Sequence, residues 1–211
     1  MGDYPRDSEL RDGAEAFSFF QSFLGFVIRE KRMMFRREKR VVRLTCKDAC
    51  ISGSNAAVLS GVVLSLCSKI EEGSAAGALN GPSQWIWGEH EAYTRRATAR
   101  HTLVGYTIHH ASSMLWALAY EHAFGRCRSR ALARVPVPQI LAEAAVTAAV
   151  AYCVDYYVAP RRLRPGFRKH LGSGGMFASY AAFGLGLALT TLAKRRTARV
   201  SASAAPSSRA R

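Results

Sequence analysis

The chain has 211 residues and a formal net charge of +15 at pH 7. A charge of this size suggests nucleic-acid binding when it is spread over helical faces, but here the basic residues cluster in residues 29–47, 126–134, 161–169 and 194–211. Long stretches between these clusters contain almost no basic residues, which is typical of a membrane protein. The five cysteines are odd in number and include no CxxC pair, which argues against a disulfide scaffold, a zinc ribbon and a thioredoxin-like motif.

The N-terminal segment, residues 1–48, has a phenylalanine-rich run of about fifteen residues followed by a strongly basic block. The run is short for a membrane span, and its aromatic and basic composition fits an interfacial helix lying on anionic lipid. A secretory signal is disfavoured because the basic block follows the apolar run and no small-residue cleavage site is present. The alternative interpretation is a misassigned start, with Met33 or Met34 as the first residue.

Four stretches are long and apolar enough to cross a bilayer as helices, which takes about 20 residues each. They cover residues 49–68, 102–120, 137–158 and 172–193, and only the third contains charged residues. We therefore predict an all-α fold, an integral membrane bundle of four transmembrane helices in residues 49–193. A soluble helical bundle is the alternative, because the first stretch contains several serines and is only moderately apolar.

The segments that connect the spans suggest an orientation. Basic residues are more frequent in residues 29–47, 126–134 and 194–211 than in residues 69–100 and 161–169, which predicts that both termini are cytoplasmic. The first loop carries aromatic residues suited to a bilayer surface, where it is expected to lie and to form a short helix: Trp85, Trp87 and Tyr93. The tail, residues 194–211, is rich in Ser, Ala and Arg and is predicted to be disordered.

Small residues recur four positions apart on the predicted spans, as close helix packing in a membrane requires. We interpret them as packing seams rather than as sites. On the first span they are Gly53, Ala57 and Gly61, and on the fourth Ala178, Ala182 and Gly186; the third span is alanine-rich throughout, including Ala144, Ala148 and Ala151.

Two histidines and three acidic residues in or beside the spans form the candidate polar site: His109, His110, Glu121, Glu143 and Asp155. A carboxylate inside a span is costly unless it is paired, hydrated or protonated. The short loop between the second and third spans makes them antiparallel neighbours, which places Glu121 and Glu143 at similar depth. The histidines are then nearer to Asp155 than to Glu143.

These residues allow two interpretations. In the first they line a polar track for a proton or a metal ion, or a histidine ligates haem. In the second each histidine hydrogen-bonds a neighbouring helix and adds modestly to packing. Haem has less support, because no paired histidines lie at matching depth on two spans, and no cofactor is predicted. Asp155 is expected to pair with Arg161 or Arg162 where the third span leaves the membrane.

Two stretches, one from GPSQWIWGEHEA through GYTIHHASSMLWALAYE and the other VDYYVAPRRLRPGF, resemble small uncharacterised multi-pass inner-membrane proteins of proteobacteria. The resemblance covers about residues 50–193, and the first forty residues fall outside it. It implies a location in a bacterial cytoplasmic (inner) membrane and implies no activity.

The sequence contains no nucleophile elbow, phosphate-binding glycine loop, HExxH motif or nucleotide fingerprint, which argues against an enzyme. The leading hypothesis is therefore a non-enzymatic accessory or envelope component. Its expected partners are the lipid bilayer and other membrane proteins or further copies of the chain, with no nucleic acid. The alternative is a small transporter, or a redox or metal-binding membrane subunit that uses the intramembrane histidines and Glu143.

Overall fold

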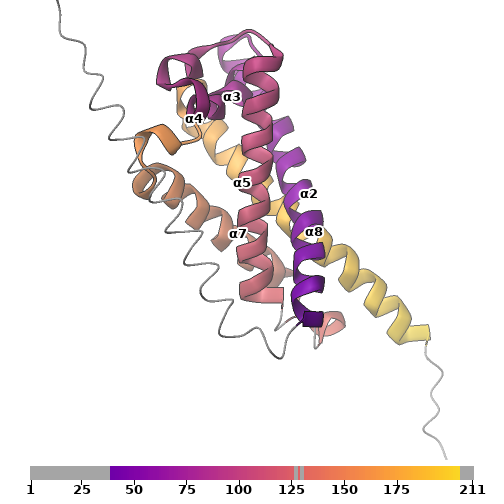
Figure 1. Ribbon diagram of the computed structural model, residues 1–211. Helices are drawn as coiled ribbons and strands as arrows, with labels where there is room; N and C mark the ends of the chain where they lie inside the picture. Colours follow the sequence, from indigo (N-terminus) through magenta and orange to yellow (C-terminus); the bar gives the residue numbers. More distant parts are fainter. Residues whose placement is uncertain (1–38, 126–127, 129–130, 205–211) are drawn as a thin grey trace, which may run out of the picture.

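The computed structural model describes residues 39–125, 128 and 131–204, and the regular structure in this part of the chain is entirely helical. Its four long helices lie alongside one another, with the short helices α3 (Gly77–Asn80) and α4 (Gln84–Trp87) at one end (Figure 1). The long helices are α2 (Lys39–Glu72), α5 (Val104–Tyr120), α7 (Val137–Cys153) and α8 (Ser173–Ala204). The all-α prediction is thus confirmed for the described residues. The predicted interfacial helix and the alternative start fall before residue 39, outside them.

Three helical segments are long and apolar enough to cross a membrane: Cys46–Glu72, Val137–Val158 and Ser173–Ser203. The second has the predicted bounds, because a π-helical turn, η6 (Val154–Val158), continues α7. α5 has 17 residues, about 26 Å at 1.5 Å per residue, which is less than the roughly 30 Å of a hydrocarbon core. Two π-helical turns extend it, η3 (Ala99–Leu103) and η4 (Glu121–Gly125).

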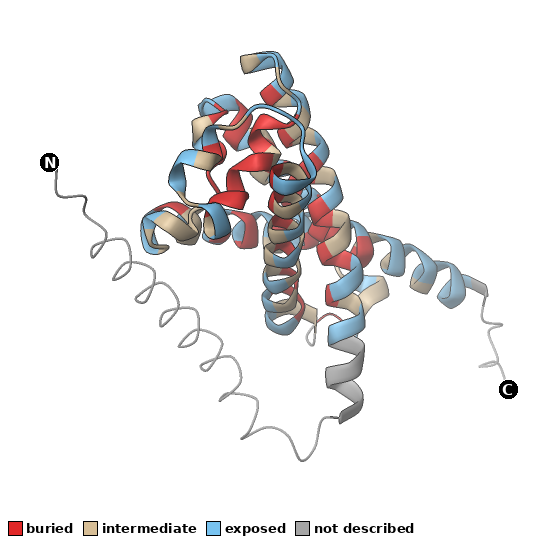
Figure 2. Ribbon diagram, turned by 45° about the horizontal axis from the view of Figure 1, so that its top comes forward, coloured by how far each residue is buried: buried red, intermediate tan, exposed pale blue. Residues whose placement is uncertain are grey.

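The outer faces of the long helices are apolar, whereas several inner positions are small and polar. About half of the surface of Val58 and of Val62 on α2 is exposed, while Ser52 and Ser60 on the same helix are buried. Figure 2 shows exposed outer faces on the long helices and buried residues where the helices meet. This distribution is expected when lipid rather than water surrounds a bundle.

Small residues let the helices approach closely. A Cβ atom on Gly53 would lie 2.8 Å from the Cα atom of Met114 on α5, and one on Gly186 would meet the backbone of Ala56. The seams predicted on α2 and α8 are confirmed at these two contacts. α2 packs along both α5 and α8, and α7 packs along α8, but α5 and α7 contact each other at few positions.

We expect Gly186→Val to lower the free energy of unfolding by about 1–3 kcal/mol, the usual cost of overpacking. The added side chain would force α8 away from the Ala56 backbone. Thermal unfolding of the detergent-solubilised protein measures the change. Gly174→Ala is the control, because a Cβ atom there meets nothing within 4 Å. Equal losses in the two variants would contradict the packing role of Gly186.

Residues 73–98 form a cap on one end of the bundle. Its short helices are α3 (Gly77–Asn80), η1 (Gly81–Ser83), α4 (Gln84–Trp87) and η2 (Glu89–Tyr93). The buried Asn80 side chain donates to the carbonyls of Thr94 and Arg96, at 2.6 and 3.0 Å, and accepts from the Thr102 hydroxyl at 2.7 Å. The predicted short helix in this loop is therefore present, and the loop is packed onto the bundle.

The C-terminal end of the bundle differs from the sequence-based expectation. α8 continues to Ala204, so the prediction of a disordered tail from residue 194 is wrong for residues 194–204. Alanine and arginine are strong helix formers, and adding turns to a helix that packing already holds avoids the cost of nucleation. The remaining short elements are η5 (Leu132–Arg134), η7 (Arg161–Leu163) and η8 (Phe167–Lys169).

Candidate functional site

A cavity of about 310 Å³ lies between α5 and α7, where these two helices make few contacts. α8 forms a further wall, and the cap and the loop before α8 contribute Trp85 and Phe167. Most of the lining is apolar. The polar groups come from His109, Asp155, Tyr180 and several serines, so two of the five candidate residues line one cavity.

His109 contributes an imidazole to the α5 wall. Its Nε2 atom lies 3.0 Å from the hydroxyl oxygen of Ser60, and Ser60 donates its own proton to the carbonyl of Ala56 at 2.6 Å. Nε2 therefore donates to Ser60, which leaves Nδ1 of a neutral imidazole as an acceptor. The ring of Phe167 packs edge-on, with the two ring centroids 5.7 Å apart.

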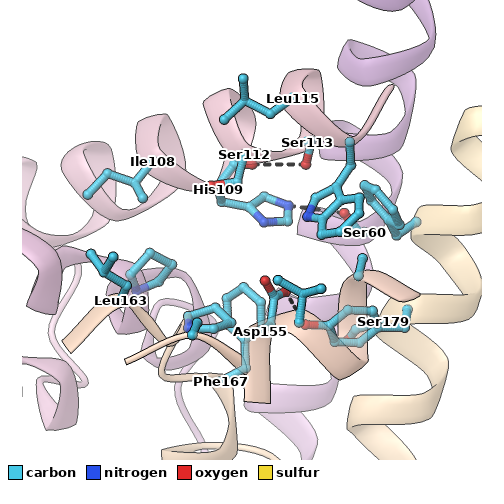
Figure 3. A pocket seen from close by; sticks show the side chains of 18 of the residues that line it. Ser60, Ile108, His109, Ser112, Ser113, Leu115, Asp155, Leu163, Phe167 and Ser179 are labelled. Carbon is cyan, nitrogen blue, oxygen red and sulfur yellow. Dashed lines mark hydrogen bonds between the residues drawn. The ribbon is translucent and has the colours of Figure 1, made fainter. Parts of the chain in front are cut away.

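Asp155 contributes a carboxylate from the opposite wall, so that the two side chains face the cavity from different elements (Figure 3). It lies in η6, and π-helical turns of this kind frequently occur at functional sites. Its Oδ2 atom accepts a hydrogen bond from the Tyr180 hydroxyl at 2.6 Å. Within residues 46–125, 128 and 131–203, no cation forms an ion pair with this carboxylate.

The predicted pairing of Asp155 with Arg161 or Arg162 is therefore wrong. Both arginines lie in η7, beyond Pro160, whereas the carboxylate is held inside the bundle by Tyr180. Hydropathy gives the depth of a residue in a span but not its rotation about the helix axis. For this reason the sequence does not identify Tyr180 as the partner of Asp155 or Ser60 as the partner of His109. The only signal for either residue is a hydroxyl group within an apolar span.

His110 lies at a different place from its neighbour. Its Nε2 atom is 3.2 Å from the hydroxyl oxygen of Ser54 on α2, and the ring of Tyr106 packs edge-on at 5.8 Å between centroids. Consecutive residues point in different directions around a helix, which explains why one histidine lines the cavity and the other bridges α5 to α2. The packing interpretation fits His110 best.

Glu121 and Glu143 are joined by an arginine at the other end of the bundle. Arg128 donates to Glu143 at 2.6 Å and to Glu121 at 3.1 Å, and its guanidinium lies 4.4 Å from the ring centroid of Tyr120. The two carboxylates therefore lie within reach of one guanidinium.

The five candidate residues thus occupy three places, and only His109 and Asp155 share one. Among the residues that the structure describes, no group of three or more His, Cys, Asp or Glu side chains lies close enough to hold a metal ion. The donor set of the cavity is one imidazole, one carboxylate and hydroxyl groups. Such a set suits hydrogen bonding and charge pairing with a small molecule.

Comparison of the chain with protein-family models, with curated proteins and with solved structures finds no match.

Proposed function

We propose that this chain is a multi-pass membrane protein that binds a small cationic molecule with an apolar body, as a small transporter does. The observation that carries the proposal is the Asp155 carboxylate, which faces a cavity within a predicted span and has a hydroxyl partner but no described cation. An ionisable residue inside the membrane is a functional-site hypothesis by default, because its burial is costly. A ligand with a positive charge would supply the missing countercharge.

The rest of the cavity suits the same class of ligand. A volume of about 310 Å³ lies at the lower end of the range for small-molecule sites, about 300–1,000 Å³. Trp85 and Trp116 contribute aromatic surface to the lining, and aromatic faces attract cations. The free nitrogen of His109 offers an acceptor to a second polar group.

We also propose a topology of four spans with both termini cytoplasmic, in the inner membrane of a bacterium. α5 packs along α2, and with its π-helical turns it belongs to a helical stretch from Ala99 to Gly125, which supports a fourth span. Taken together, residues 29–47, 126–134 and 194–211 contain more basic residues than residues 69–100 and 161–169, which supports the orientation. The choice of membrane rests on the sequence resemblance alone.

The proposal favours the transporter among the functions that the sequence leaves open. A redox or metal-binding membrane subunit has less support than a transporter, because Glu143 forms an ion pair with Arg128 and lies outside the cavity. An accessory or envelope component that acts through helix contacts remains the second candidate. The exposed apolar faces of α2 and α7 favour it, since neighbouring helices as well as lipid can cover them.

A matched pair of probes tests the binding proposal. 1-Naphthylmethylamine carries a positive charge at neutral pH, and 1-naphthalenemethanol is its neutral counterpart. We expect calorimetric titration of the detergent-solubilised protein to show at least tenfold tighter binding of the amine. Asp155→Asn is expected to abolish this preference, because the amide keeps the size of the side chain and its contact with Tyr180 but loses the charge.

The control is Glu89→Gln, which removes an exposed carboxylate from the cap, outside the lining of the cavity. It is expected to bind both probes as the unmodified protein does, after correction for partition into empty micelles. Equal affinity for amine and alcohol in the unmodified protein would overturn the proposal. So would an Asp155→Asn variant that still prefers the amine.

A further inference from the structure

A second, larger concavity runs along α7 and α8 and is separate from the His109–Asp155 cavity over most of its length. Its volume is about 1,030 Å³. The two helices line it with small side chains, which leave room between them: Ala144, Ala145, Ala148, Ala149, Ala181 and Gly184. Large apolar residues lie at its margins, among them Leu141 and the strongly exposed Phe177. This groove accepts an apolar chain rather than a polar solute.

One end of the groove is basic. Arg168 lines it there, donates a hydrogen bond to the Tyr152 hydroxyl, and places its guanidinium 4.5 Å from the ring centroid of Tyr156. The side chain is exposed, and residues 156–193 contain no Asp or Glu. Glu71 occupies the backbone amide of Gly172 at 2.6 Å, so the charged group of the lining that can meet an anion here is the guanidinium of Arg168.

The length of the groove matches one leaflet of a bilayer. Its lining on α7 extends from Leu141 to Cys153, a rise of about 18 Å at 1.5 Å per residue. Half of a hydrocarbon core is about 15 Å. Arg168 lies between the third predicted span and α8, where a cation meets the headgroup layer. An apolar groove about as long as one leaflet, with a cation at its outer end, is complementary to a lipid with an anionic headgroup.

We propose that this groove is a binding site for an anionic phospholipid, with an acyl chain lying between α7 and α8 and the phosphate paired with Arg168. A second copy of the chain fits the same surface less well. A twofold axis along the membrane normal would bring the two Arg168 side chains to the same level, and like charges placed together oppose association.

The test measures lipid bound to the purified full-length protein by native mass spectrometry, after exchange into detergent with equal amounts of phosphatidylglycerol and phosphatidylcholine of identical acyl chains. We expect phosphatidylglycerol to be retained preferentially. Arg168→Gln is expected to lower this preference about fivefold, the effect of one basic residue at an anionic surface. Arg161→Gln, which alters another exposed arginine of the same loop outside the groove lining, is its control.

A second pair of variants tests the groove itself. Ala145→Phe fills it from an exposed position and is expected to lower retention of both lipids severalfold. Val146→Phe is matched in position and size but lies outside the lining, with 56% of its surface exposed, and is expected to retain both lipids. Equal retention by these two variants would overturn the proposal, as would an equal effect of the two arginine variants. If the mass spectrum showed a dimer and Ala145→Phe dissociated it, the proposal would be overturned, and the occupant of the groove would be a second copy of the chain.

Discussion

Arg128→Ala is expected to lower the free energy of unfolding by about 3–5 kcal/mol, the cost of removing one partner from a buried ion pair. Only 3% of the Arg128 side chain is exposed, and it contacts Glu121 and Glu143 together. Without the guanidinium, two carboxylates from different helices would share a desolvated space with no countercharge from that residue. Chemical unfolding of the protein in mixed micelles, followed by circular dichroism, measures the loss.

Two further variants separate charge from packing. Arg134→Ala, in the same loop and exposed, is expected to change stability by less than about 0.5 kcal/mol, as surface substitutions usually do. Adding Glu121→Gln and Glu143→Gln to Arg128→Ala removes the uncompensated charge and is expected to recover part of the lost stability. A triple variant as unstable as Arg128→Ala would show that the arginine acts through its packing on Tyr120 instead.

Hydropathy was sufficient to predict where the long helices lie. The predicted span, residues 137–158, has the same bounds as α7 and η6 together. Pro136 precedes this apolar run and Pro160 follows it, so both ends are marked in the sequence. The end of α8 was not predicted, because residues 194–204 are polar in composition yet continue a helix that packing has already formed. Hydropathy measures affinity for lipid and not helix propensity, so it places the end of the span and not the end of the helix.

The sequence predicts which candidate residues lie close together but not which side chains they contact. The antiparallel arrangement of the second and third spans correctly placed Glu121 beside Glu143, and His109 near Asp155. The sequence did not indicate that Arg128 joins the two glutamates, although a short arginine-rich loop between two carboxylates was a usable signal. It also could not separate His109 from His110, because that requires the rotation of α5 against α2.

Asn80→Ala is expected to open the cap. The amide is fully buried and donates to the backbone carbonyls of Thr94 and Arg96 in the last part of the cap, while its oxygen accepts from Thr102. Each hydrogen bond lost at these partly buried groups costs about 0.5–1.5 kcal/mol. A loss of about 2 kcal/mol raises the population of the opened cap more than tenfold. Trypsin cleavage after the exposed Arg95 and Arg96 is expected to accelerate by a similar factor.

His90→Ala is the matched control, because this residue lies in the same cap and is exposed, and its cleavage rate is expected to stay unchanged. The cap also contributes Pro82 and Trp85 to the lining of the His109–Asp155 cavity. Opening it is therefore expected to weaken binding of 1-naphthylmethylamine together with the rise in cleavage. Faster cleavage with unaltered amine binding would mean that α5, α7 and α8 form the ligand site without the cap.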